Sequence, residues 1–236
     1  MTVEVCLAPG LYEEKLTQKD FNTVITDIFR ATTSVVAALD YGIKSIIPVP
    51  NLEKAREFKK MGFIVAAERE GKKLDFSDIG NSATEFRNPE LKGKRIAYST
   101  TNGVKAIKMA GDAENILLGA FTNLSAVAEW LAKDKKQVVI FCAGWKNKVN
   151  LEDTLFAGAL ADLLLKKFNF TTNCDSAHLA MDAWEKAGPD LLNYIEKASH
   201  RHRLAHVIDQ HLLEYTFDID SSSTVPIYRD GRIIPA

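Results

Sequence analysis

The octapeptide TDIFRATT, residues 26–33, indicates both the fold of this chain and the place of its chemistry. The apolar residues before it predict a buried strand, and the run from Val35 to Leu39 predicts a helix. Thr32-Thr33-Ser34 can cap this helix. The carboxylate of Asp27, the guanidinium of Arg30 and the free N–H groups of a helix start therefore meet at one strand end. Such groups can hold a metal-bound phosphate, but an acid–base pair at a βα junction can also be a local salt bridge.

Two further strand-to-helix junctions have the same polar character. Residues 95–98 predict a strand that runs into STTNG, residues 99–103, and then a helix from Val104. Residues 137–141 predict a strand that leads into CAG, residues 142–144, followed by Lys146, Lys148 and the pair Glu152-Asp153. Ligands in open α/β sheets bind beyond the carboxyl ends of the strands, so parallel strands would bring all three junctions to one edge of the sheet.

The order of the elements predicts an α/β fold with three layers, α/β/α. Strand patterns occur at 3–7, 23–28, 44–49, 63–67, 94–99, 115–119 and 137–142, and helical patterns alternate with them at 32–41, 51–61, 101–110, 122–132 and 152–168. Crossover helices between successive strands indicate a mainly parallel sheet that is covered on both faces.

The rest of the chain departs from this alternation. The polar region 69–93 predicts a loop that borders the site, and region 175–215 predicts helices with a break at Gly188-Pro189. Residues 225–234 predict a hairpin that turns at Asp230-Gly231. We expect one domain over residues 1–236, with a helix-rich C-terminal part from about residue 175.

The composition limits the partners of the protein. The 236 residues are 46% hydrophobic and carry a net charge of −1, which argues against a nucleic-acid surface and requires any anion to meet a local cluster of Arg and Lys. The three cysteines lack a CxxC spacing, which is typical of reduced thiols in a cytoplasmic protein. The N-terminus resembles a strand and not a signal peptide, and no apolar run has the length of a membrane span. We expect a small anionic partner, no nucleic acid and no membrane, and a homo-oligomer is compatible with the sequence.

Several well-known phosphate-handling motifs are absent from the sequence. There is no GxxxxGK[ST], GxGxxG or GxSxG pattern. Phe29 stands where a haloacid-dehalogenase-type phosphatase would carry its second Asp, and Lys148 stands where a cysteine-type phosphatase loop at Cys142 would carry Arg. Lysine lacks the forked donor set of arginine, so the second match is imperfect.

Acidic residues at the strand ends are candidates for a metal site. Asp27, Glu152 and Asp153 offer the oxygen ligands that Mg²⁺ prefers, although acids in a first helical turn also favour the helix dipole. Consecutive helical residues point roughly 100° apart, so we expect at most one of Glu152 and Asp153 to touch the metal.

Three other polar groups have an ordinary structural explanation beside a functional one. Glu68-Arg69 form a charged strand end or a solvated pair, and Ser82 can simply cap a short helix. His202 and His206 have a chelating spacing, but they alternate with arginines as on a solvated basic helix face.

Together these residues resemble the 2-phosphosulfolactate phosphatase family. The similar pieces occur in the family's order over nearly the whole chain: residues 27–33, 68–69, 80–82, 100–103, 142–144, 152–153 and 225–226. The resemblance implies a three-layer α/β/α fold and a magnesium-dependent phosphomonoesterase that releases phosphate and sulfolactate, a step toward coenzyme M. The chain departs from the family pattern at Tyr215-Thr216-Phe217, where the family tends to place a cysteine, so a similar small phosphorylated acid is an alternative substrate.

The residues and the resemblance give one set of expected site residues. The catalytic candidates are Asp27, Arg30, Cys142 and Glu152; the substrate-binding candidates are Thr32, Thr33, Arg69, Asn81, Ser82, Thr100, Thr101, Asn102, Gly103 and Gly144; the metal candidates are Asp27, Glu152 and Asp153, for Mg²⁺. Asp27 can ligate the metal, act as a general base or attack phosphorus itself, and Cys142 is the alternative nucleophile. Two other functions remain open: a lyase or isomerase acting on a phosphorylated acid, and a non-catalytic anion-binding module.

Overall fold

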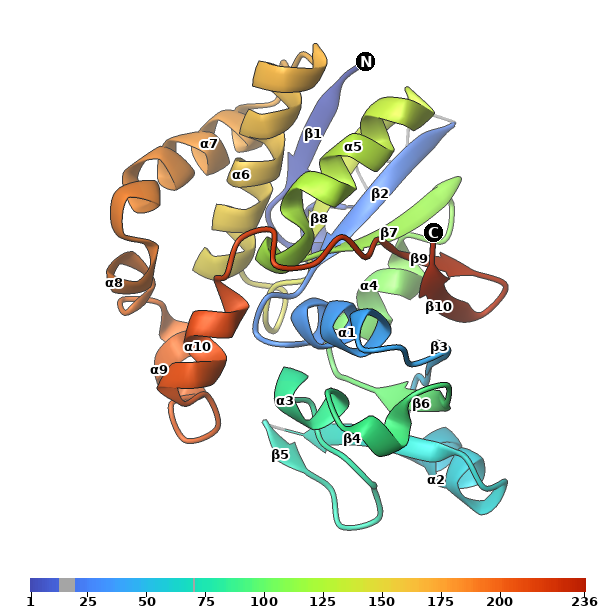
Figure 1. Ribbon diagram of the computed structural model, residues 1–236. Helices are drawn as coiled ribbons and strands as arrows, with labels where there is room; N and C mark the ends of the chain where they lie inside the picture. Colours follow the sequence, from blue (N-terminus) through green and yellow to red (C-terminus); the bar gives the residue numbers. More distant parts are fainter. Residues whose placement is uncertain (13–19, 70) are drawn as a thin grey trace.

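The computed structural model describes residues 1–12, 20–69 and 71–236 (Figure 1). Within these residues, ten strands form one sheet: β1 (Val3–Cys6), β2 (Phe21–Thr26), β3 (Ser45–Pro48), β4 (Ile64–Arg69), β5 (Lys72–Lys73), β6 (Arg95–Ser99), β7 (Asn115–Gly119), β8 (Gln137–Cys142), β9 (Pro226–Arg229) and β10 (Arg232–Pro235).

The helices follow the strands in alternation and then fill most of the C-terminal part. They are α1 (Ala31–Asp40), α2 (Leu52–Lys60), α3 (Ala83–Phe86), α4 (Gly103–Met109), α5 (Leu124–Asp134), α6 (Leu151–Phe168), α7 (Asp175–Ala187), α8 (Leu191–Ile195), α9 (Ser199–Arg203) and α10 (Gln210–Thr216). No helix in the described part of the chain is long and apolar enough to span a membrane.

The sheet consists of two parallel blocks that run in opposite directions. Strands β1, β8, β2 and β7 pair in parallel and form the large block. Strands β3, β6 and β4 pair in parallel and form the small block. The hairpin β9–β10 lies between them, antiparallel to β7 on one side and to β3 on the other, so the small block is reversed relative to the large block.

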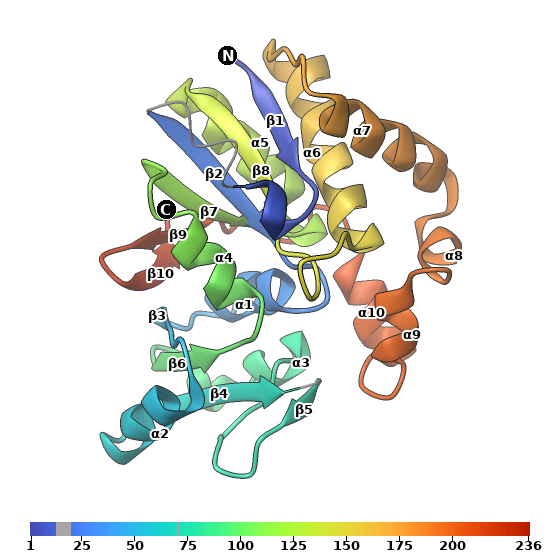
Figure 2. The same cartoon turned by 180° about the vertical axis from the view of Figure 1, so that it is seen from behind.

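The twist of the sheet brings the carboxyl ends of both blocks to one cavity. Neighbouring strands in a sheet rotate relative to one another with a fixed hand, and the rotation accumulates across the hairpin. Strand β4 consequently runs across the direction of β2 (Figures 1 and 2). The expectation that all polar junctions lie on one edge of a parallel sheet is therefore wrong, but the junctions still meet, because reversal and twist act together.

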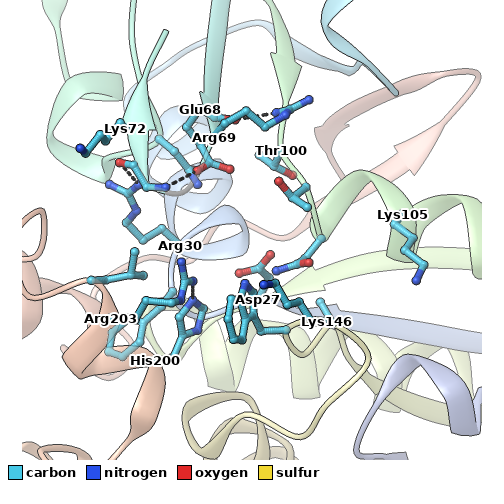
Figure 3. A pocket seen from close by; sticks show the side chains of 18 of the residues that line it. Asp27, Arg30, Glu68, Arg69, Lys72, Thr100, Lys105, Lys146, His200 and Arg203 are labelled. Atoms are coloured by element: carbon cyan, nitrogen blue, oxygen red, sulfur yellow. Dashed lines mark hydrogen bonds between the residues drawn. The ribbon is translucent and has the colours of Figure 1, made fainter.

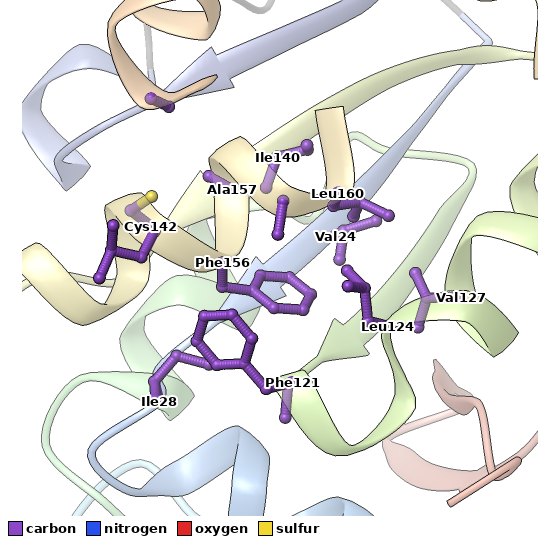
Figure 4. Close-up of a cluster of buried hydrophobic side chains, with 14 of the residues drawn as sticks. Val24, Ile28, Phe121, Leu124, Val127, Ile140, Cys142, Phe156, Ala157 and Leu160 are labelled. Atoms are coloured by element: carbon purple, nitrogen blue, oxygen red, sulfur yellow. The ribbon is translucent and has the colours of Figure 1, made fainter. Parts of the chain in front are cut away.

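Alternating side chains of the large block face two apolar layers. Val24 and Ile140 face a cluster with residues of α5 and α6, which Figure 4 shows around Phe121 and Phe156. Ile25, the residue next to Val24, faces the opposite cluster with residues of α1 and α4. Since strand side chains alternate between faces, this arrangement confirms a sheet covered on both sides.

The sequence predicted nearly all elements, with two corrections. Region 69–93 is not only a loop, since it contains β5 and α3. Helix α1 begins at Ala31 after Arg30 without a side-chain cap. The hydroxyl of Thr32 accepts the N–H of Asp27 at 3.1 Å, and that of Thr33 donates to the carbonyl of Ile28 at 3.0 Å, so both hold the turn before the helix and do not cap it.

Close packing of α6 on α7 requires a glycine at position 158. A Cβ atom there would lie 2.0 Å from the carbonyl oxygen of Ala180 in α7. We therefore expect Gly158→Ala to lower the free energy of unfolding by about 1–3 kcal/mol or more, as for other overpacked cores. Urea denaturation measures the change, and Gly188→Ala, whose Cβ would meet nothing within 4 Å, serves as the control. An unchanged stability of Gly158→Ala would contradict this packing.

Candidate active site

A cavity of about 1010 Å³ lies where the two blocks meet (Figure 3). Its walls come from the ends of β2, β4, β6 and β8 and from the C-terminal segment around α9. The predicted site residues Asp27, Arg30, Arg69, Asn81, Thr100, Thr101 and Asn102 all line it. The geometry thus brings together groups from both blocks.

Asp27 directly follows β2 and is nearly buried in the cavity wall, with 6% of its surface exposed. Its Oδ1 lies 3.5 Å from the N–H of Ala31 at the start of α1. The pKa of Asp27 is raised to about 6, mainly by burial and also by the carboxylates of Glu68 and Glu152, while His200 and the Ala31 N–H oppose the rise. A carboxyl group with a pKa near neutrality suits proton transfer.

Gly103 lets the start of α4 approach Asp27 closely. A Cβ atom on Gly103 would lie 3.1 Å from the hydroxyl oxygen of Thr100 and 3.8 Å from Oδ2 of Asp27. The Thr100 hydroxyl is buried and has no hydrogen-bond partner among the described residues. A buried polar group without a partner is costly, so this hydroxyl is suited to binding a ligand atom in the cavity.

Arg30 is held by the small block and not by its neighbour in sequence. Its Nη2 donates to the carbonyl of Gly71 at 2.9 Å, and the N–H of Gly71 donates to Oε2 of Glu68 at 2.8 Å. In the part of the chain that the structure describes, no ion pair joins Arg30 to Asp27. This geometry argues against a merely local salt bridge at the βα junction.

The cavity carries a local excess of positive charge. Two carboxylates, Asp27 and Glu68, face six cationic side chains in its lining: Arg30, Arg69, Lys72, Lys105, Lys146 and Arg203. Lys148, which follows the predicted strand end at residues 142–144, is exposed and lies outside the lining. Because the whole chain has a net charge of −1, this concentration of cations marks a place for an anionic ligand.

Asp153 ties two loops of the site together. Its Oδ1 accepts the N–H of Ile28 at 2.9 Å, and its Oδ2 accepts the N–H of Gly144 at 3.0 Å. Burial raises its pKa well above the usual value, Glu152 and Asp27 add to this, and the two N–H donors oppose it. Both oxygens are thus engaged with backbone outside the cavity lining, which leaves Asp153 poorly placed as a metal ligand.

Glu152 reaches the cavity only through a histidine. It is fully buried, and its Oε1 lies 2.6 Å from Nδ1 of His200, which lines the cavity. Its Oε2 has no partner among the described residues. His200 and Arg203 are site residues that the sequence reasoning missed, because residues 201–206 resemble a solvated basic helix face and nothing local marks His200 as buried.

Cys142 lies in the apolar core and not in the cavity. Its side chain is fully buried in the cluster between β8 and α6 (Figure 4). Burial raises the pKa of its thiol well above the usual value, with Asp153 adding to the effect. Since the thiolate is the reactive form, this environment suits an inert apolar filler and not a nucleophile.

The remaining predicted residues shape the walls from outside the lining. Thr32 and Thr33 hold the turn before α1, and Ser82 precedes α3, where its N–H donates to Glu85 at 3.2 Å. Gly144 adopts a positive φ of 59°, and a Cβ there would lie 2.3 Å from the carbonyl oxygen of Lys148. Their contribution is therefore to the shape of the loops.

Comparison of the sequence with known proteins identifies the family of the chain. The sequence model of the 2-phosphosulpholactate phosphatase family matches residues 6–231. The chain belongs to this family. This confirms the resemblance found in the sequence and makes the protein an enzyme of the phosphoric monoester hydrolase class.

Its relatives within the family match over nearly their full length. A probable 2-phosphosulfolactate phosphatase of Thermotoga maritima is 34% identical over 232 residues, which cover 98% of this chain and 97% of the relative. The relative from Clostridium tetani is 33% identical over 237 residues, 99% of this chain and 100% of its own. The relative from Caldanaerobacter subterraneus is 32% identical over 219 residues, 91% and 90% of the two chains.

Asp27 and Cys142 have opposite expected mutational effects. We expect Asp27→Asn to lose at least about two orders of magnitude in phosphate release, as for other catalytic carboxylates, while Cys142→Ser keeps substantial activity. A phosphocysteine trapped at position 142, or the reverse ranking of the two variants, would contradict this assignment.

The same Asp27→Asn variant should be more stable than the wild type near pH 7.5. The pKa of Asp27 rises from 3.8 to about 6 on folding, so its ionisation costs stability as the pH rises through this window, and the full cost is present above about 6. Removing the charge should raise the free energy of unfolding by roughly 1–3 kcal/mol at pH 7.5 and by little at pH 3.5, measured by urea denaturation. An equal effect at both pH values would speak against a buried ionised carboxylate.

Arg30→Lys should impair turnover although it keeps the charge. Lysine cannot reproduce the forked donor set, and a lost charge-assisted hydrogen bond of about 1.5–3 kcal/mol lowers kcat/KM by about 10- to 100-fold. The matched control is Lys148→Met, which removes an exposed cation outside the cavity and should leave kcat/KM unchanged. Wild-type kcat/KM in Arg30→Lys would mean that Arg30 only braces the Gly71 turn.

Proposed function

We propose that this enzyme hydrolyses 2-phosphosulfolactate to sulfolactate and inorganic phosphate with the help of a bound Mg²⁺. The observation that carries the proposal is the set of six cationic side chains around Asp27 in a chain of nearly neutral charge. The substrate carries a phosphate, a sulfonate and a carboxylate on three carbons, and so dense an anion needs such a cavity. The names of the family and of its relatives support the same substrate.

The oxygen ligands that line the cavity are compatible with Mg²⁺. The described residues contain no group of three or more His, Cys, Asp or Glu side chains arranged as a metal site. Mg²⁺ commonly uses one or two carboxylates and completes its shell with substrate phosphate and water, so Asp27 and Glu68 would suffice. When bound there, the cation would neutralise phosphate charge and polarise the phosphoryl group.

The side chains around the cavity suggest how the reaction proceeds. Arg30, braced at Gly71, and the unpartnered hydroxyl of Thr100 would hold the phosphoryl oxygens in place. Where Glu68 holds the cation, the carboxylate of Asp27, at the end of β2 in the cavity wall, would accept the proton of the attacking water. The bond between phosphorus and the alcohol oxygen of sulfolactate breaks as the new bond to the water oxygen forms. The leaving oxygen takes the bonding pair and is protonated by solvent water, and phosphate and sulfolactate then depart.

A panel of phosphomonoesters, assayed for released phosphate, tests this function. We expect 2-phosphosulfolactate to be the best substrate, and exhaustive EDTA treatment to abolish activity that MgCl₂ then restores. The observation behind the metal dependence is that carboxylates, and no Cys or His cluster, face the cavity among the described residues.

Three results would contradict the proposal in different ways. Full phosphate release after exhaustive EDTA treatment would show that the reaction needs no metal ion. Turnover of the phosphorylated acid without inorganic phosphate would indicate a lyase or isomerase. A rise of Tm with ligand but no product would indicate a binding module.

A further inference from the structure

A buried polar chain runs from α6 to the cavity wall. The fully buried Glu152 contacts Nδ1 of His200 at 2.6 Å, and Nη2 of Arg203 contacts Nε2 of the same ring. Arginine can only donate, so Nε2 of His200 accepts from it, while Nδ1 of the ring faces the carboxylate of Glu152 and the side-chain amide of Asn150. The histidine thus links a buried carboxylate to a cationic side chain in the cavity lining.

Aromatic stacking holds Arg203 in place from a second side. Its guanidinium carbon lies 4.5 Å from the ring centroid of Trp145, and the same ring lies nearly parallel to that of His200 at 6.4 Å. In the described structure His200 is the hydrogen-bond partner of the guanidinium, and Nε has none. A planar cation that is fixed on two sides and keeps unused N–H groups is preorganised for an oxyanion.

The segment that carries Arg203 spans both blocks of the sheet. His200 anchors it to α6 beside the large block, and the next residue after α9, Leu204, packs against the turn of the small block at Gly71. A Cβ atom on Gly71 would lie 2.9 Å from Cδ2 of Leu204, and Gly71 is also the residue that braces Arg30. Figure 3 shows Arg30, His200 and Arg203 together at one side of the cavity.

We propose that Arg203 binds the acid group of the substrate that is not hydrolysed, a carboxylate or a sulfonate, and that His200 and Glu152 act as positioning residues for it. The inference rests on the proposed function, in which Asp27, Arg30 and Thr100 hold the phosphoryl group. A second acid on a neighbouring carbon needs a second cation nearby. Lys72, Lys105 and Lys146 are exposed side chains, and the two Nη atoms of Arg69 already donate to the carbonyl of Glu68 and the hydroxyl of Ser99. Arg203 is half-buried and held in place, so we assign the binding of that acid to Arg203.

Substrates that lack one acid at a time test this assignment. The series is 2-phosphosulfolactate, 2-phospholactate without the sulfonate, 1-sulfopropan-2-yl phosphate without the carboxylate, and isopropyl phosphate without either. Arg203→Met should lower kcat/KM for 2-phosphosulfolactate by about 10- to 100-fold, mainly through KM, and change that for isopropyl phosphate by less than about threefold. If Arg203→Met lowers kcat/KM for only one of the two single-acid substrates, the acid group on that substrate is the one that Arg203 binds.

Further variants separate binding from folding. Arg203→Lys keeps the charge without the fork and should lie between Arg203→Met and wild type. His200→Gln should reduce the preference for the acidic substrate in the same direction as Arg203→Met, because the guanidinium of Arg203 loses its hydrogen-bond partner. Arg201→Met is the matched control on α9, because Arg201 contacts Glu196 and the carbonyl of Ile208 outside the lining, and it should leave the preference unchanged.

The outcomes distinguish this inference from the proposed function. An equal loss on all four substrates in both Arg203 variants, or no loss, would overturn the role of Arg203 while leaving the phosphatase in place. A wild-type enzyme that releases phosphate from none of the four would instead overturn the proposed function.

Discussion

The pairing of the β9–β10 hairpin between β7 and β3 sets the direction of every strand beyond it. It satisfies the backbone groups at the edges of two parallel blocks that would otherwise be exposed. Because each step across the hairpin is antiparallel, the small block is reversed, and the accumulated twist turns its carboxyl ends toward those of the large block. The last dozen residues of the chain therefore decide that one cavity collects the polar ends of β2, β4, β6 and β8.

The two blocks contribute complementary chemistry to that cavity. The large block supplies buried acids, of which Asp153 ties the loops after β2 and β8 together through two backbone N–H groups. The small block supplies the turn at Gly71 that holds Arg30 and the unpartnered hydroxyl of Thr100. Concentrating Asp27, Glu152 and Asp153 in one poorly solvated region costs stability, as their mutual effects on the pKa of Asp27 and of Asp153 indicate. This cost is typical of functional sites, where ligands and cations relieve it.

Sequence reasoning succeeded where the signal is local. Hydrophobic periodicity predicted the strands and helices, and the polar residues after β2, β6 and β8 predicted where the site begins. It failed on the reversal of the small block, because pairing with a hairpin more than a hundred residues away from β7 leaves no local trace. It also missed His200 and Arg203, whose burial depends on how α9 docks, and it overestimated Thr32 and Thr33, whose hydroxyls bond to nearby backbone.

The most direct test of a site shared by the two blocks is a crystal structure of the protein with sulfolactate, phosphate and Mg²⁺ bound. We expect the phosphate to contact Arg30 and to lie beside Asp27, two residues that follow β2 of the large block. We also expect it to accept a hydrogen bond from the hydroxyl of Thr100, which follows β6 of the small block. Ligands that contact only one block, or that bind outside this cavity, would contradict a shared site.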